Sequence, residues 1–480
     1  MVVTELKGRI LVYSINGCVH CIQAKRLLEK FQLPHITVNV DIHTQCKDWM
    51  LANLKKKSVP QIFFNDVHIG NYNDLKALMS DDNRLAELIE LVKNNPLSEA
   101  ALKIPCPETD LDNFFSCEIN CETDEYVDLV NDLKKSGIIA YRWSGLCKFK
   151  KLFSEKDFVD WVTKTKNTDY QEAVRLCKAL LSHHFCREVS NAGWLNRDDT
   201  YYMLLEDLSS SALNAKPISF CKPTTLDKLG KRLRFQISAI YDSYLSANGK
   251  VVDYKSIEDS NEFKQYEKLT LQLQRVQFGY ESDDQKLAFF INIYNALVIH
   301  GIIRFGPPTN IVTRYNFFNK TRYMIGGYSY SLREIENGVL RANETGIGMI
   351  TKPFQKTDPR LRVAMPEVNP YIHFALVCGA SGCPPISIYS AEEVHVQLQQ
   401  AAELFLESDE NLVVDAEKKQ VKLSLIFKWY RKDFHNTDKG LLEWIFCVLK
   451  KGEKKSNLRK VIDEGKVTIV YLPYNWSLNS

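Results

Sequence analysis

The 480-residue sequence has no large excess of charge of either sign: 62 lysines and arginines stand against 59 aspartates and glutamates, for a formal net charge of +3. Proteins whose main partner is a nucleic acid carry a marked basic surplus, so no such partner is expected. The chain also lacks an N-terminal basic-then-apolar segment with a cleavage site, and we expect no apolar run as long as a membrane span. These absences predict a cytoplasmic protein without a transmembrane segment, at most peripheral at membranes.

Cysteine is not scarce, but its pattern excludes several kinds of site. The thirteen cysteines are an odd number, and without a secretory context they predict reduced thiols. Cys117 and Cys121 have the spacing of half a metal site, but no second pair with zinc spacing follows, so we expect no metal. No long internal repeat is present. With 45% apolar and 25% charged residues, the chain has the composition of folded domains, about three at roughly 150 residues each.

One pair of cysteines lies in a setting that favours chemistry. Residues 9–14 form an apolar run typical of a buried strand, and apolar side chains recur at helical spacing over residues 22–31. Cys18 and Cys21 lie at the junction, where the N–H groups and positive dipole end of a helix N-terminus stabilise a thiolate. We therefore predict Cys18 as the nucleophile and Cys21 as the resolving thiol. The alternatives are half a zinc site or two thiols without a role.

Three pieces of residues 1–95 belong together: Cys18-Val19-His20-Cys21, Ser58-Val59-Pro60 and the turn from Gly70 to Asp74. Through them this stretch resembles a glutaredoxin, an oxidoreductase of the thioredoxin fold. The resemblance implies that Pro60 is cis and faces the cysteines, with the Val59 backbone turned toward a bound thiol peptide. It also implies that the turn holds the glutamyl end of glutathione with backbone N–H groups. The residues concerned are Gly70, Asn71, Asn73 and Asp74, the last predicted to cap a helix over 75–79.

Four positions depart from the glutaredoxin pattern. Val19 and His20 replace the usual proline and tyrosine, Ile15 replaces a lysine that pairs with a glutathione carboxylate, and Asn71 replaces the second of two glycines. A cationic His20 would raise the thiolate fraction of Cys18, whereas a solvated loop histidine would not. Glutathione is the expected cosubstrate, and an iron–sulfur cluster held between two copies through Cys18 is the less favoured alternative.

The middle of the chain contains Asp157-Phe158-Val159-Asp160-Trp161-Val162, the helical run from Ala173 to Leu181, and Asp199-Thr200-Tyr201-Tyr202. Through these pieces it resembles a DEP domain, a winged helix. An acidic linker is predicted over 96–123, and the resemblance covers 124–208, with helices first and a hairpin of 185–189 and 200–204 last. It implies a role in intracellular signal transduction, with a signalling protein or an anionic membrane surface as partner. A basic patch for anionic lipid would consist of Arg142, Lys148, Lys150, Lys151 and Lys156. An ordinary solvated charged surface is the alternative.

The remainder is predicted as a helical connector over 209–275 and a mixed, mostly helical α+β domain over 276–480. The latter resembles the family called domain of unknown function 547, through 289–297, 332–341, 373–385 and 427–434. We predict a buried strand over 372–380 that ends near Cys378, which suggests a thiol hydrolase with His300 or His373 as base. Five residues along one strand place His373 and Cys378 on opposite faces. We therefore favour a structural role over catalysis, in which Asn292, Asn295 and His373 are paired polar residues of a buried core.

The sequence thus predicts a multidomain α/β and α+β protein with a thioredoxin-fold domain, a winged helix and a mixed C-terminal domain. The favoured function is glutaredoxin-type thiol–disulfide exchange with glutathione and protein disulfides, coupled to the DEP module. The alternatives are a non-catalytic signalling adaptor with a degenerate glutaredoxin domain, and a thiol hydrolase in the C-terminal domain.

Overall fold

The chain forms two compact units, each built from separated stretches of sequence. The computed structural model describes residues 7–15, 18–40, 43–56, 58–97, 121–143, 149–189, 199–208, 211–246 and 249–480. The first unit contains 1–118, 234–262 and 369–480, and the second contains 119–233 and 263–368. The predicted domain boundaries stay a prediction.

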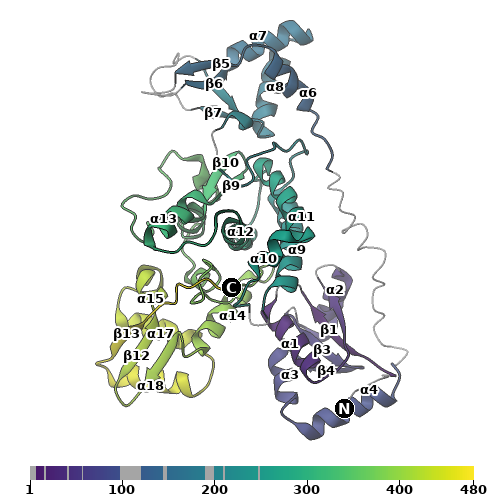
Figure 1. Ribbon diagram of the computed structural model, residues 1–480, viewed down its shortest axis with the longest axis vertical. Coiled ribbons are helices and arrows are strands. Elements are labelled where there is room, and N and C mark those ends of the chain that lie inside the picture. The colour runs from purple at the N-terminus through teal and green to yellow at the C-terminus, as the bar shows by residue number, and fades with distance from the viewer. Residues whose placement is uncertain are drawn as a thin grey trace. The chain divides into compact units, whose positions relative to one another are not determined.

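The N-terminal part of the first unit is a four-stranded sheet in the order β2-β1-β3-β4 (Figure 1). Its strands are β1 (Ile10–Ser14), β2 (Ile36–Asn39), β3 (Gln61–Phe64) and β4 (Val67–Gly70). β1 runs parallel to β2 and antiparallel to β3, which pairs antiparallel with β4. The helices are α1 (Val19–Lys30), α2 (Thr44–Leu54), α3 (Tyr72–Leu78) and α4 (Asp82–Asn94). The expected β3–β4 hairpin is confirmed, whereas α2 and α4 were not predicted.

Alternation along the strands divides this sheet between two cores. Ile10 and Val12 face one side and pack with residues of α1, α3 and α4. Leu11 and Tyr13 face the other side and pack with residues of α2, together with Cys18 and Val59. Successive strand residues point to opposite faces, so one five-residue strand serves both cores. All five residues of β1 are buried, as predicted for the run 9–14.

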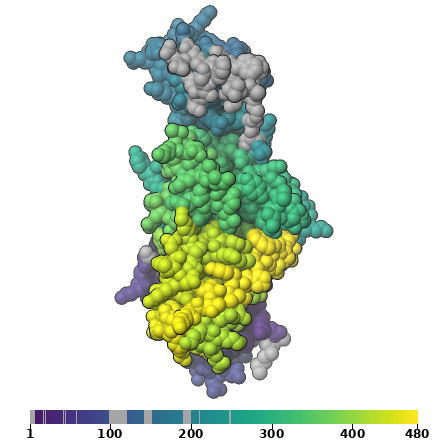
Figure 2. Space-filling model, turned by 90° about the vertical axis from the view of Figure 1, so that its left-hand side faces the viewer, coloured from purple at the N-terminus to yellow at the C-terminus, as the bar shows by residue number. Residues whose placement is uncertain are grey.

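The C-terminal part of the first unit is an α+β assembly, coloured light green to yellow in Figure 2. Its elements are η5 (Pro370–Phe374), α14 (Val394–Glu407), β11 (Leu412–Asp415), β12 (Gln420–Ser424), α15 (Ile426–Trp429), α16 (Arg431–Phe434), α17 (Asp438–Val448), α18 (Glu453–Glu464) and β13 (Thr468–Leu472). β12 lies between β11 and β13. α10 (Tyr254–Asp259) also belongs to this unit, and α9 (Leu226–Tyr244) spans the division between the units.

The predicted buried strand over 372–380 is wrong. Residues 370–374 form the 3₁₀ helix η5 instead, with Pro370 in its first turn and Asn369 as N-cap. The apolar side chains are nevertheless buried, because Phe374 packs among the rings of Phe405, Phe427 and Trp444. Residues 372–377 are apolar except for His373 because they pack into an aromatic core, and not because they form a central strand of a sheet.

The second unit begins with a four-stranded antiparallel sheet in the order β5-β6-β8-β7. Its elements are α6 (Val127–Lys135), β5 (Ala140–Trp143), β6 (Phe149–Ser154), α7 (Glu155–Lys166), α8 (Tyr170–Ser182), β7 (Cys186–Val189), β8 (Tyr201–Leu204) and η1 (Leu205–Asp207). The β7–β8 pairing confirms the expected hairpin. Ser154 and Asp169 cap α7 and α8 through their side chains. The assignment to the DEP family stays a prediction.

The rest of the second unit surrounds the long helix α12 (Asp283–Phe305). Around it lie α11 (Asn261–Thr270), η2 (Leu271–Arg275), α13 (Ile311–Lys320), the hairpin β9 (Arg322–Ile325) and β10 (Tyr328–Ser331), the π-helical η3 (Glu334–Leu340) and η4 (Pro359–Val363). Contrary to expectation, α12 is long and apolar enough to cross a membrane by length and composition, but 89% of its most apolar stretch is buried inside the protein. Packing within the unit accounts for that composition without a bilayer.

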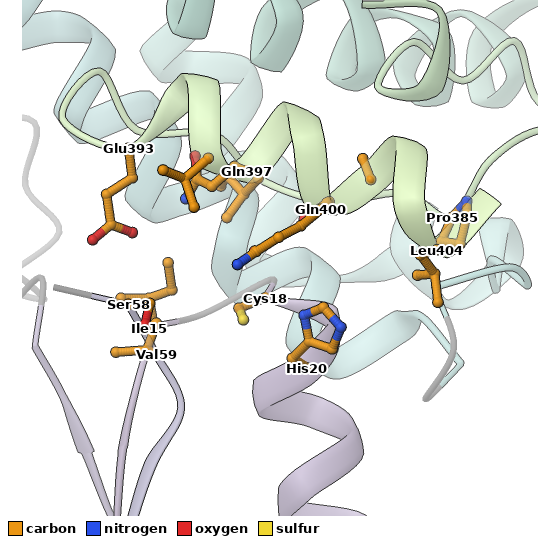
Figure 3. A pocket seen from close by; sticks show the side chains of 14 residues that line it. Ile15, Cys18, His20, Ser58, Val59, Pro385, Glu393, Gln397, Gln400 and Leu404 are labelled. Carbon is orange, nitrogen blue, oxygen red and sulfur yellow. The ribbon is translucent and has the colours of Figure 1, made fainter. Parts of the chain in front are cut away.

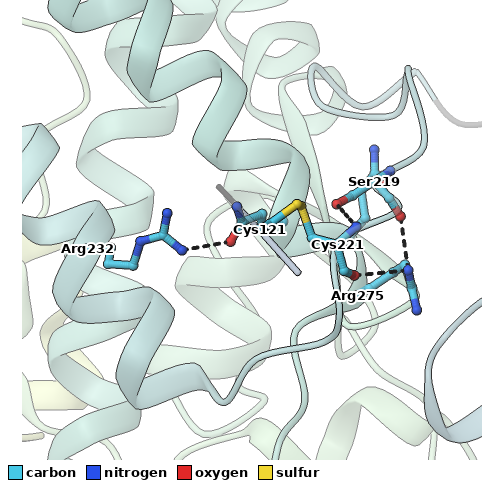
Figure 4. The surroundings of a disulfide bond; sticks show 7 residues. Cys121, Ser219, Cys221, Arg232 and Arg275 are labelled. Carbon is cyan, nitrogen blue, oxygen red and sulfur yellow. Dashed lines mark hydrogen bonds between the residues drawn. A yellow bond between two sulfur atoms is a disulfide. The ribbon is translucent and has the colours of Figure 1, made fainter. Parts of the chain in front are cut away.

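A disulfide ties the start of the second unit to a distant segment. Cys121 is bonded to Cys221, 100 residues later (Figure 4). The expectation of reduced thiols is therefore wrong for these two cysteines, and Cys121 does not form half of a metal site with Cys117, which lies outside the described residues. Residues 121–124 pair with 220–222 through backbone hydrogen bonds on either side of the disulfide.

Beside the disulfide, a buried charge cluster joins four segments. The Arg275 guanidinium pairs with Asp124, and neither side chain is more than 1% exposed. Arg275 also donates to the carbonyl oxygens of Ser219 (3.0 Å) and Cys221 (3.1 Å), as Figure 4 shows, and to that of His183 (2.7 Å). Each buried donor thus has an acceptor, which is the condition under which a buried charge is tolerated.

Candidate functional site

The two cysteines of the first motif lie at the start of α1, as predicted. Cys18 is the N-cap residue of α1, and its sulfur accepts a hydrogen bond from the backbone N–H of Cys21 at 3.3 Å. Cys18 is partly exposed, whereas Cys21 is fully buried. Burial, together with the neighbouring Cys18, raises the pKa of the Cys21 thiol well above its usual value. The accessible sulfur at the helix N-terminus is therefore the one placed to attack a substrate.

Cys18 opens onto a pocket whose two walls come from distant parts of the first unit (Figure 3). One wall consists of Ile15, Cys18, His20, Ser58 and Val59. The other consists of Pro385, Ser387, Ile388, Glu393, Val396, Gln397, Gln400, Ala401 and Leu404, from α14 and the loop before it. Gln400 reaches from α14 toward the Cys18 sulfur in Figure 3. The sequence motifs predicted the first wall and gave no sign of the second.

The loop that enters β3 has the expected backbone. The Val59–Pro60 peptide bond is cis, as the resemblance implied, and Val59 lies in the pocket wall beside Cys18. The Gln61 side chain donates to the Ser58 carbonyl oxygen at 2.8 Å, and its own carbonyl oxygen contacts His68 Nε2 at 2.7 Å. Gln61 and His68 were not predicted; together they tie this loop to the β3–β4 hairpin.

The turn predicted to hold glutathione is closed by its own side chains. Asn71, and not Asp74 as predicted, is the N-cap of α3. Asn71 Oδ1 accepts from the N–H of Asn73 (2.8 Å) and Asp74 (3.4 Å), and Asp74 Oδ2 accepts from the N–H of Asn71 (2.8 Å). At Gly70, with φ of +119°, an added Cβ would lie 2.2 Å from Asp74 Oδ2, so the turn requires glycine. The N–H groups expected to bind a carboxylate already have partners.

His20 does not supply a positive charge to Cys18. It is partly buried in the pocket wall, and its ring lies 5.9 Å from that of Tyr72. Burial and the charge of Lys450 lower the pKa of His20, despite the opposing effect of Glu403 and Glu407. The lowered pKa disfavours the cationic imidazole that would raise the thiolate fraction of Cys18.

Comparison with known proteins covers both ends of the chain. Residues 10–69 match the family described as Glutaredoxin. "Glutaredoxin 1" of Rickettsia typhi is 34% identical over 88 residues, which make up 18% of this chain and 84% of that protein. "Glutaredoxin 1" of Escherichia coli is 29% identical over 79 residues, 15% of this chain and 93% of that protein. This chain belongs to the glutaredoxin family. The solution structure of a Brucella melitensis glutaredoxin has 26% identity, covering 19% of this chain and 95% of that one, with a TM-score of 0.17.

The second match lies in the C-terminal part of this glutaredoxin-family protein, and the matched family has no known function. Residues 280–406 match "Protein of unknown function, DUF547", which confirms that resemblance. The matched stretch spans both units, from α12 in the second to α14 in the first.

The two histidines predicted as bases of a thiol hydrolase each contact other polar groups. His300 lies in the second unit, where Nδ1 contacts Tyr323 Oη at 2.7 Å and Nε2 contacts Glu267 at 3.1 Å. His373 lies in the first unit, where Nε2 contacts Asp433 at 2.8 Å and the ring stacks on Tyr430. Each histidine thus has buried polar partners within its own unit, and Asn292 and Asn295 lie buried on α12. The polar core predicted around Asn292, Asn295 and His373 stays a prediction.

Cys378 has a partner that sequence reasoning missed. Its sulfur lies 3.2 Å from that of Cys383, and the backbone N–H of Cys378 donates to Cys383 Sγ at 3.2 Å. Tyr474 Oη donates to the same sulfur at 3.2 Å. Cys378 is partly exposed and Cys383 is buried. The signal available in the sequence was a second cysteine five residues after the first, with two glycines between them.

The proposed basic patch can be described only in part. Lys151 pairs with Asp207 at 3.3 Å, and Lys156 is exposed on α7. Lys148 and the side chains of Arg142 and Lys150 lie outside the described residues. Across the described part of the chain, no three His, Cys, Asp or Glu side chains form a group that could hold a metal ion.

Proposed function

We propose that this protein is a glutathione-dependent thiol–disulfide oxidoreductase in which Cys18 is the nucleophile. The observation that carries the proposal is the placement of the accessible Cys18 sulfur at the N-terminus of α1, in a pocket shared with Val59 of the cis-proline loop. Helix N–H groups stabilise the thiolate that attacks and later leaves.

The exchange proceeds in two balanced steps. The Cys18 thiolate attacks the glutathione sulfur of a mixed disulfide, the S–S bond breaks, and the substrate leaves as a thiolate that takes up a proton. A glutathione thiolate then attacks the sulfur bonded to Cys18, which releases glutathione disulfide and regenerates Cys18. The alternative resolving thiol, Cys21, must first lose its proton, and its raised pKa disfavours that step.

The pocket favours small or extended substrates. The wall from α14 lies opposite Cys18 (Figure 3), so a disulfide on a flat protein surface cannot approach this sulfur without displacing that wall. A glutathionyl group at the end of a flexible side chain or a small molecule can enter the pocket. Reduction of glutathione mixed disulfides is therefore proposed over direct reduction of disulfides within folded proteins.

The test is turnover of a small glutathione mixed disulfide, coupled to glutathione reductase and NADPH. The wild-type chain and Cys21→Ser are expected to turn over, and Cys18→Ser is expected to be inactive. Cys46→Ser is the matched control, because Cys46 is a buried cysteine of the same domain outside the motif. Activity retained by Cys18→Ser, or absent from a folded wild-type chain, would overturn the proposal.

A second candidate is a non-catalytic adaptor, favoured by a specific observation. The N-terminus of α3 is occupied by the Asn71 side chain, and Ile15 stands where a lysine would pair with glutathione. An adaptor would retain the fold and lose affinity for glutathione. The coupled assay separates the two candidates, since an adaptor gives no turnover at any glutathione concentration.

We also propose that residues 124–208 act as a DEP-type targeting module for an anionic membrane surface. The exposed Lys156 and the lysine-rich segment 148–151 support this role. Vesicles containing anionic lipid are expected to bind the full chain at low salt and to release it as salt screens the charges over about 10 Å. Binding that is unaffected by Lys150→Glu with Lys156→Glu would leave signalling proteins as the partner.

A further inference from the structure

A short loop of the first unit holds a second pair of thiols in contact. Residues 378–383 lie between η5 and α14, and the chain turns at Gly379, where φ is +85°. The loop is pinned to the C-terminal segment: the N–H groups of Ser381 and Gly382 donate to Ser477 (2.8 Å) and Asn475 (2.9 Å). At Gly382 an added Cβ would lie 3.0 Å from backbone atoms of Asn475. Two glycines thus let the loop fold back and bring both sulfurs together.

The distance between the sulfurs suits a reversible bond. Cys378 Sγ and Cys383 Sγ are 3.2 Å apart, and a disulfide needs them at about 2.05 Å. An approach of roughly 1 Å is a change of side-chain torsions, which leaves the backbone pinning of the loop in place. A hydrogen-bonded pair of thiols with no redox role is the alternative.

The surroundings of the two sulfurs are unequal. Cys383 Sγ accepts hydrogen bonds from Cys378 N–H and Tyr474 O–H. Burial opposes ionisation of Cys383, but hydrogen bonds from Cys378 and Tyr474 outweigh it and lower the pKa of Cys383 to about 7. The hydrogen bond to Cys383, together with burial, raises the pKa of Cys378 well above its usual value. Cys383 is therefore the better leaving thiolate, and Cys378, the more exposed of the two residues, is the better candidate for attack by an incoming thiolate.

We propose that Cys378 and Cys383 form a second redox-active pair, which cycles between two thiols and an intramolecular disulfide by exchange with a thiol–disulfide couple. In the reducing direction an incoming thiolate attacks Cys378 Sγ, the Cys378–Cys383 bond breaks, and Cys383 leaves as a thiolate held by Tyr474 O–H and Cys378 N–H. A second thiolate attacks the incoming sulfur, which releases Cys378 to take up a proton. Two incoming thiols become one disulfide and release two protons. The pair gains two electrons, Cys378 takes up one of the protons, and the other goes to the Cys383 thiolate when it becomes a thiol, or to solvent.

Two sources can supply the incoming thiols, and both react by the same exchange. One is two molecules of glutathione. The other is Cys18 with Cys21 of the same chain, because Pro385, two residues after Cys383, lines the pocket onto which Cys18 opens. This second source rests on the proposed function, whereas exchange with free glutathione does not.

The test is a titration of the full chain in buffers of varied glutathione to glutathione disulfide ratio. Samples are acid-quenched and alkylated, and the peptide with Cys378 and Cys383 is weighed by mass spectrometry. The proposal expects a single transition from two labels to none, on the wild-type and on the Cys18→Ser, Cys21→Ser background alike. Two labels at every ratio, in protein that remains folded, would overturn it.

Two further experiments test the leaving role of Cys383 and identify the incoming thiol. Tyr474→Phe removes one donor to the Cys383 thiolate and is expected to shift the equilibrium with glutathione about tenfold toward the disulfide, the equivalent of one hydrogen bond to a charged group. An unchanged midpoint would contradict the leaving role of Cys383. The second experiment measures how fast the pre-oxidised pair is reduced in the wild type and in Cys18→Ser. A slower rate in the variant identifies Cys18 as the incoming thiol, and an equal rate identifies glutathione. Either result leaves the pair redox-active.

Discussion

Asn71 Oδ1 lies 2.8 Å from the backbone N of Asn73 and accepts its hydrogen bond, so the side chain of Asn71 occupies the helix end at which a glutathione carboxylate would bind. A ligand carboxylate must displace this cap before it can reach the same N–H group. If the proposed function holds, the Asn71 side chain competes with a glutathione carboxylate for this N–H group.

Asn71→Gly is expected to lower the KM for a glutathione mixed disulfide about fivefold. The substitution frees backbone N–H groups of the turn, and one new hydrogen bond from them to the substrate contributes roughly 1 kcal/mol to binding. The loss of the cap is tolerable, because glycine costs only a few tenths of a kcal/mol at an N-cap. Asn71→Asp is the matched control: it keeps the cap and adds a charge that repels a carboxylate, so KM is expected to rise. An unchanged KM in both variants would show that the turn does not contact glutathione.

Removal of the Arg275 charge is expected to destabilise the second unit strongly. Arg275→Met removes the guanidinium partner of the buried Asp124 carboxylate, which keeps its contacts with His183 Nδ1 (2.8 Å) and the Tyr126 N–H (2.9 Å). Loss of one partner of a buried ion pair costs about 3–5 kcal/mol. Arg175→Met is the control, because the Arg175–Glu172 pair is exposed and contributes little. Urea unfolding measures both, and equal unfolding midpoints for the two variants would refute the importance of the Asp124–Arg275 pair.

The Cys121–Cys221 disulfide is expected to stabilise the same unit by about 2–5 kcal/mol, because it closes a loop of 100 residues in the unfolded chain. Cys121→Ser should therefore unfold at lower urea concentration than the wild type under non-reducing conditions. In the presence of a strong reductant the two proteins should unfold alike. Alkylation of both Cys121 and Cys221 in native, unreduced protein would contradict the disulfide.

The stability of the second unit should fall in mild acid because of His184. Burial, with the charges of Arg362 and Arg275, lowers the pKa of His184 to about 4, against about 6.5 in an unfolded chain. Between these values the unfolded state binds a proton that the folded state does not, so stability is full above pH 6.5 and is lost as pH falls toward 4. The loss is about 2 kcal/mol after allowance for partial exposure.

His184→Asn removes this titration and suits the backbone, since His184 has φ of +54° and asparagine tolerates that region. Urea midpoints at pH 7.5 and 4.5, read from hydrogen exchange of peptides in α8 and β7, should differ less in the variant than in the wild type. An equal acid sensitivity would assign the effect to other groups.

The glutaredoxin part could be predicted well from local sequence. The β1–α1 junction and the β3–β4 hairpin follow from motifs that lie within a few residues. The cis peptide before Pro60 was implied by the resemblance to glutaredoxins. The prediction at α3 was wrong because two residues that favour N-caps lie three apart: Asn71 caps the helix, and Asp74, the predicted cap, completes a capping box with it.

Contacts between distant residues could not be predicted in this way. Asp124 and Arg275 are 151 residues apart, and nothing local marks either as buried. The second wall of the Cys18 pocket, from α14, depends on how separate stretches of the first unit assemble. The strand predicted near His373 failed because an apolar run records burial and not backbone geometry.

The most direct test of the central claim is the capture of a Cys18–glutathione mixed disulfide in Cys21→Ser. This variant is exposed briefly to limiting glutathione disulfide, and the modified peptides are identified by mass spectrometry. The internal reference is Cys447, an exposed thiol near the C-terminal end of α17. Unlike Cys18, it does not lie at a helix N-terminus, so no helix N–H groups stabilise its thiolate. The account predicts that Cys18 acquires a glutathionyl group well before Cys447 and loses it on addition of reduced glutathione. Modification of Cys447 at the same rate as Cys18, or faster, would contradict the assignment of Cys18 as the nucleophile.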